Sequence, residues 1–176
     1  MAEITNTKLD RMRYTKDKRS SQMVLLAIVL NVLYYVSIYQ QDHPVVKPIS
    51  ADYPYYSWLI GASVILNLLF LLIGFLCSEG VKGRRKGYTG ILLFLGVLQL
   101  VRIFYLPAKA HNAVYSETVK NAEGIAEVVT KKVMTHGQYA FAVAMLVLSG
   151  ILCIAAAVNS YLNNKKLADY MKSIES

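Results

Sequence analysis

Residues 57–77 read SWLIGASVILNLLFLLIGFLC, a run of 21 residues without a charged side chain. An α-helix needs about 20 mostly apolar residues to cross the hydrocarbon of a bilayer. The run is apolar on every face, whereas a strand of a membrane barrel alternates over about 10 residues. It therefore predicts one membrane-spanning helix.

Three further runs have the same character, at residues 21–39, 88–106 and 138–161. The first ends at Tyr39 and is followed by Gln40 and Gln41 rather than by a small-x-small cleavage pattern, which favours a retained span over a signal peptide. Charged residues make up only 17 % of the chain, against about 25 % in soluble domains. The predicted fold is an all-α membrane protein, an antiparallel bundle of four transmembrane helices with an external amphipathic helix.

The distribution of basic residues predicts the orientation. Of the 19 lysines and arginines, 13 lie in the tail 1–20, the loop 78–87 and the tail 162–176. Short cytoplasmic segments carry such an excess, so we expect both termini in the cytoplasm and the four spans in the plasma membrane. This topology also accounts for the net charge of +8 without a nucleic-acid partner.

The connection between the last two spans carries a periodic apolar pattern. Its members recur at steps of three and four and predict an external amphipathic helix over residues 116–132. The stripe either packs on the protein's own outer face, lies on the lipid headgroups, or docks another subunit. It consists of Val119, Ala122, Ala126, Val129 and Val133.

Polar residues occur near mid-depth in every predicted span, namely Asn31, Asn67, Gln99 and Ser149. They predict one interhelical polar layer, in which Asn31 and Asn67 face each other and each contact contributes about 0.6 kcal/mol. The alternative is a polar solute path. A transport path usually has ionisable groups at mid-depth, and these positions have none, so a structural role is favoured.

Arg102 is the only charged residue within a predicted span, about one helical turn before Pro107. Near a helix end, an arginine can extend its side chain to the interface, so the sequence predicts that Arg102 points outward. The alternative is a salt bridge to an outer acid of this chain or of a partner.

Small residues follow one face of the fourth span: Ser149, Gly150, Cys153 and Ala157. Residues of this size at steps of three and four allow helix backbones to approach closely. The face predicts a packing surface, either for another helix of this chain or for a partner.

Evidence for metal binding or catalysis is weak. His43, His111, His136 and Asp42 all fall on the predicted outer side and are candidate zinc or copper ligands. They lack the paired spacing of recognisable metal sites, so ordinary surface histidines are the favoured interpretation. No catalytic motif is present, so the sequence predicts a protein that is not an enzyme and has no cofactor.

These features predict a non-catalytic accessory subunit of a larger integral membrane complex, with a transporter as the favoured complex. Its expected partners are membrane lipids and other integral membrane subunits. One alternative is a small homo-oligomeric channel or transporter. Another is a membrane enzyme or an external metal sensor.

Overall fold

The computed structural model describes residues 11, 14–39, 54–120, 126–132 and 134–175. Its long helices are α2 (Lys18–Tyr39), α3 (Pro54–Lys82), α4 (Lys86–Val101) and α6 (His136–Glu175). A 3-10 turn, η1 (Arg102–Phe104), and a short helix, α5 (Leu106–Asn112), follow α4.

Within the described residues, four helical segments are long and apolar enough to cross a membrane: α2, α3, the α4–α5 segment and α6. They overlap the four apolar runs of the sequence. The break after α4 has a local cause, because Pro107 has no N–H to bond the carbonyl four residues earlier. The chain therefore has the helices of a multi-pass membrane protein.

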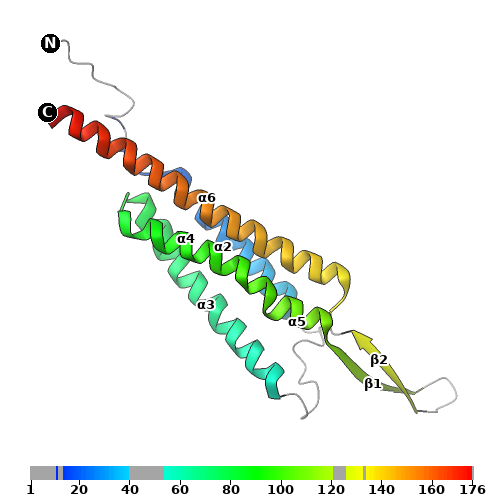
Figure 1. Cartoon of the computed structure of the whole chain (residues 1–176). Coiled ribbons are helices and arrows are strands. Elements are labelled where there is room, and N and C mark those ends of the chain that lie inside the picture. The colour runs from blue at the N-terminus through cyan, green and yellow to red at the C-terminus, as the bar shows by residue number, and fades with distance from the viewer. Residues whose placement is uncertain (1–10, 12–13, 40–53, 121–125, 133, 176) are drawn as a thin grey trace.

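Successive long helices run in opposite directions (Figure 1), and α6 packs against both α2 and α4. Helix α3 packs on α2. It approaches α4 where the two are joined and diverges from α4 toward the opposite end (Figure 1). The joining turn needs a left-handed backbone at Arg84, whose φ is 56°.

Two glycines set the closest approach between α4 and α6. A Cβ atom added to Gly96 would lie 3.0 Å from the carbonyl oxygen of Gly150, and one added to Gly150 would lie 3.0 Å from that of Gly96. Neither position has room for a side chain without movement of the helices. The small residues of both helices are therefore used for backbone contact inside this chain.

The core consists of two apolar clusters, one toward each end of the helices. The first is near the α3–α4 turn and includes Val24, Phe70, Leu92 and Ala156. The second, near α5, includes Tyr34, Ile38, Leu106, Met134 and Leu146. Along α2, α6 and the α4–α5 segment, the predicted polar residues lie between the two clusters, whereas Asn67 of α3 lies about one helical turn before Phe70 of the first cluster.

The external helix predicted over residues 116–132 is wrong. This segment forms an antiparallel hairpin of strands β1 (Val114–Lys120) and β2 (Ala126–Lys132), with Val114 opposite Lys132 and Lys120 opposite Ala126. Valine and threonine favour strands because their branched side chains restrict χ1 in a helix. Two runs rich in these residues flank a five-residue segment that contains Asn121 and Gly124, which is a hairpin signal. The hairpin extends beyond the helices (Figure 1).

Candidate functional site

A buried arginine is at the centre of the polar layer. Arg102 is only 4 % exposed. Its Nη1 donates to Asn31 Oδ1 at 3.0 Å and to Gln99 Oε1 at 2.6 Å, and its Nη2 donates to Asn67 Oδ1 at 2.6 Å. One guanidinium thus binds amide oxygens from α2, α3 and α4. Hydrogen bonds with a charged donor are about twice as strong as neutral ones.

Gln99 extends the layer to the fourth long helix. Its Nε2 donates to Asn31 Oδ1 at 2.9 Å and to Ser149 Oγ at 3.2 Å. Ser149 Oγ also donates to the carbonyl oxygen of Ala27 at 2.9 Å. The structure therefore brings all four residues of the predicted layer into one network. Asn31 and Asn67 are joined through Arg102.

The outward extension predicted for Arg102 is wrong. Its side chain points into the bundle, where the guanidinium also lies 5.1 Å from the centre of the Tyr34 ring. The sequence prediction considered the distance to the interface but omitted the amide oxygens of the other helices. One local signal was present, because Gln99 and Arg102 are three residues apart and share a helix face.

Three polar atoms beside this network are buried and make no hydrogen bond within the described part of the chain: Asn31 Nδ2, Asn67 Nδ2 and Ser63 Oγ. An adjoining cavity of about 10 Å³ is lined in part by Tyr34, Ser63 and Arg102. A cavity needs roughly 10–15 Å³ to hold one water molecule. The site is therefore rich in donors but has no room for a larger solute.

The small-residue face of α6 is covered by this chain's own helices. Ser149, Gly150, Cys153 and Ala157 are all buried. Ser149 bonds to α2, and Gly150 lies against Gly96 of α4. This face is therefore used for internal packing and is not open to a foreign helix.

The proposed docking stripe does not form one helical face. Val119 is paired with Glu127 and Val129 with Glu117 in the hairpin, and Ala126 is the first residue of β2. Ala122 and Val133 lie outside the described residues.

Two of the candidate metal ligands lie together. His111 Nε2 is 3.3 Å from His136 Nδ1, and the His111 ring also lies 4.5 Å from that of Tyr139. His43 and Asp42 lie outside the described residues. Within the described ranges, no group of three histidine, cysteine or acidic residues is placed to hold a metal ion.

A second polar cluster, near the α3–α4 turn, was not predicted from the sequence. Asp17 caps α2 by accepting hydrogen bonds from Ser20, through the backbone N–H at 3.2 Å and the hydroxyl at 2.9 Å. Asn163 of α6 donates to the same carboxylate at 3.2 Å, and Asn159 donates to Ser20 Oγ at 2.8 Å. Two features of the sequence indicated this cluster. Asp17 lies three residues before Ser20, a spacing typical of a helix cap, and Asn159 and Asn163 lie four residues apart on α6.

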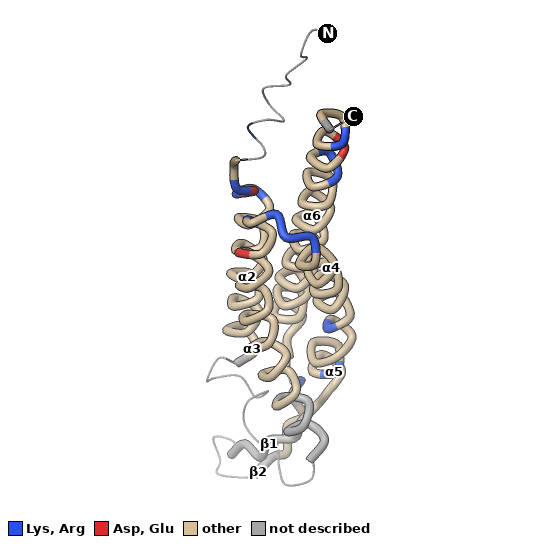
Figure 2. The backbone as a smooth tube through the Cα atoms, turned by 90° about the vertical axis from the view of Figure 1, so that its left-hand side faces the viewer, with Lys and Arg blue, Asp and Glu red and all other residues tan. Residues whose placement is uncertain are grey.

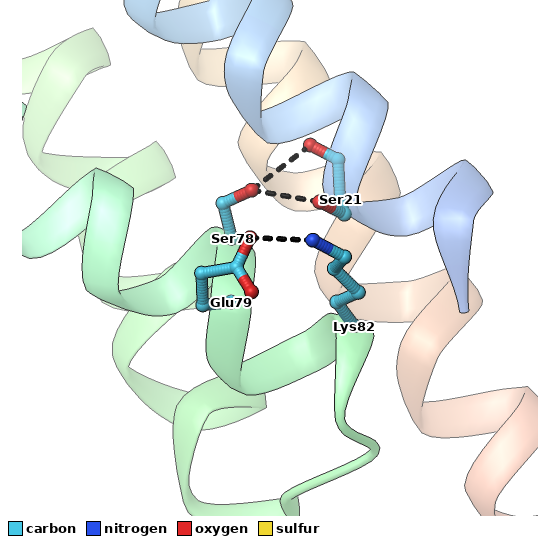
Figure 3. A network of polar contacts seen from close by, with 4 residues as sticks. All are labelled: Ser21, Ser78, Glu79 and Lys82. Carbon is cyan, nitrogen blue, oxygen red and sulfur yellow. Dashed lines mark hydrogen bonds and ion pairs between the residues drawn. The ribbon is translucent and has the colours of Figure 1, made fainter. Parts of the chain in front are cut away.

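A serine pair links α2 to α3 in the same region. The Oγ atoms of Ser21 and Ser78 are 2.8 Å apart, and Ser78 Oγ also donates to the Ser21 carbonyl oxygen at 3.3 Å (Figure 3). Beside them, the ion pair between Lys82 and Glu79 is partly exposed and lies within α3 (Figure 3). An exposed pair of this kind contributes little to stability.

The chain matches no protein-family model, no curated protein and no solved structure. A functional assignment therefore depends on the geometry described above.

Proposed function

We propose that this chain is a non-catalytic accessory subunit of a larger integral membrane complex, a transporter, and that its hairpin contacts a partner. The observation that carries the proposal is that β1 and β2 pair only with each other within the described residues. A lone two-stranded hairpin is marginally stable in water, and its free edges can accept another strand. Val114 and Val128 are 54 % and 66 % exposed, which adds apolar contact surface.

The closed interior supports an accessory role over transport by this chain alone. An apolar cluster lies on either side of the polar layer. The cavity beside Arg102 has a volume of only about 10 Å³. A solute would have to displace hydrogen bonds that join all four long helices. In the proposed complex, the substrate crosses through another subunit.

The proposed topology has both termini in the cytoplasm and the hairpin outside. Many of the described lysines and arginines lie at the end of the molecule where α2 begins and α6 ends (Figure 2). Basic residues are enriched in short cytoplasmic segments. The α3–α4 turn lies at the same end, which is consistent with four crossings of the plasma membrane.

The test is copurification in mild detergent from native membranes. We expect transporter subunits to copurify with the wild-type chain and to be lost with Val128→Asp, which places a charge on the exposed hairpin surface. The conservative change Thr130→Ser, on the same strand, is the matched control and should retain them. Both variants should insert normally, since insertion depends on the hydropathy of the spans.

The proposal is wrong if the wild-type chain purifies without other subunits, or if Val128→Asp retains them. A second candidate function then applies, a homo-oligomeric channel or transporter for anions. The buried guanidinium beside Asn31 Nδ2 and Asn67 Nδ2 favours it, because these are all hydrogen-bond donors. Purified chain in liposomes would then conduct anions, and Arg102→Gln would abolish the flux.

A further inference from the structure

A groove of about 600 Å³ lies between α4 and α6. It is at the end of α4 that adjoins the α3–α4 turn, on the surface of the bundle and away from the polar layer. Pockets of about 300–1,000 Å³ are typical of small-molecule sites. The groove is therefore large enough for part of a lipid.

The lining of the groove changes from charged to apolar along both helices. On α4, Lys86 and Thr89 are followed by Leu93, and on α6, Lys165 lies seven residues beyond Val158. Seven helical residues span about 10 Å. The polar layer of a bilayer leaflet is roughly 5–8 Å thick. When the lysines lie among the headgroups, Leu93 and Val158 therefore lie beside the acyl chains.

The charge of the groove favours an anionic occupant. Lys86 and Lys165 lie on opposite walls, and none of the described residues that line the groove is acidic. Thr89 and Asn164 add hydroxyl and amide groups beside the lysines, and Tyr161 is exposed there. Tyrosine is enriched at the headgroup level of membrane proteins. Basic pockets between helices on the cytoplasmic side bind anionic headgroups.

We propose that this groove binds an anionic glycerophospholipid of the cytoplasmic leaflet, with its phosphate between Lys86 and Lys165 and one acyl chain along Leu93 and Val158. The site rests on the proposed topology, which puts Lys86 and Lys165 at the cytoplasmic face, and is independent of the accessory role. The bound lipid would link α4 to α6 near Lys86 and Lys165, at the membrane surface.

The test uses a tryptophan reporter in the groove and brominated lipids as quenchers. The chain has one tryptophan, Trp58, so Trp58→Phe with Leu93→Trp leaves the only indole in the groove. The full chain is reconstituted in mixed vesicles of phosphatidylglycerol and phosphatidylcholine. In one preparation only the phosphatidylglycerol is brominated, and in the other only the phosphatidylcholine is brominated. We expect the brominated anionic lipid to quench the reporter more strongly than brominated phosphatidylcholine at equal mole fraction.

The double substitution Lys86→Gln/Lys165→Gln should remove this preference. One lysine near an anionic surface strengthens attraction about fivefold, so losing both should weaken anionic-lipid binding by roughly 30-fold. The matched control is Lys166→Gln/Lys172→Gln, which removes the same charge from exposed positions of α6 outside the groove.

Equal quenching by the two lipids would overturn the proposal, since the groove would then hold ordinary bulk lipid. Equal loss in the two double variants would also overturn it, because the effect would come from general surface charge. Native mass spectrometry of the chain without the reporter provides a second measurement. It should detect retained phosphatidylglycerol with the wild-type chain and the control, and none with Lys86→Gln/Lys165→Gln.

Discussion

Replacing Gly150 with leucine tests whether the small face of α6 serves internal packing. Even the first added carbon would lie 3.0 Å from the Gly96 carbonyl oxygen and 3.0 Å from Leu100 Cδ2, so α4 and α6 must separate. Overpacking costs about 1–3 kcal/mol. The bond between Gln99 and Ser149, next to the substituted residue, would lengthen and cost about 0.6 kcal/mol more. The gain in helix propensity, about 1 kcal/mol, offsets part of this loss.

We therefore expect Gly150→Leu to lower the free energy of unfolding by about 0.6–2.6 kcal/mol. The assay is unfolding of the purified chain in mixed micelles with increasing mole fraction of sodium dodecyl sulfate, followed by circular dichroism. Gly61→Leu is the matched control, because a Cβ atom at Gly61 on α3 meets nothing within 4 Å and Gly61 does not line the groove. If Gly150→Leu leaves the stability unchanged but causes the loss of a copurifying subunit, the small face of α6 packs on a partner. The packing of Gly150 on Gly96 would then be wrong.

Two further predictions concern the basic end and the topology. Asp17→Ala removes the cap of α2 and should lower the free energy of unfolding by about 1 kcal/mol in the same assay. The control Asp169→Ala, at an exposed position, should leave the free energy of unfolding unchanged. Equal effects of the two substitutions would contradict the capping role. In intact cells, an impermeant thiol reagent should label Lys132→Cys but not Arg85→Cys, and labelling of the second would reverse the topology. Background should be low because both native cysteines are buried.

The helices were predictable because the signal is local. A run of about 20 apolar residues forms a membrane-spanning helix whatever it packs against, so four runs were enough to locate α2, α3, the α4–α5 segment and α6. The polar layer was predictable for a related reason. A buried amide in a membrane span needs a partner, and residues at matching depths can supply one.

The errors occurred where structure depends on distant partners or on weak local preferences. Arg102 points inward because Asn31 and Asn67, each more than 30 residues away in sequence, supply oxygens to it. The pattern from Val119 to Val133 has helical period, but its β-branched residues favour a strand. Helical period is a weaker guide than residue type in this segment, which extends beyond the helices (Figure 1).

The polar layer has a structural explanation that needs no solute. Apolar contact gives helices no net drive to associate in lipid, so shape and hydrogen bonds must set their register. A slip of one helical turn, about 5.4 Å, would move one member of the layer into an apolar cluster. If α3 slipped, Asn67 would lose its 2.6 Å bond to Arg102, and a buried guanidinium donor would be left without this acceptor. The layer therefore specifies one alignment of α2, α3 and α4, while the Gly96–Gly150 contact fixes the spacing of α4 and α6. A bundle held in this way would support the protruding hairpin in one orientation, which is what the proposed accessory role requires.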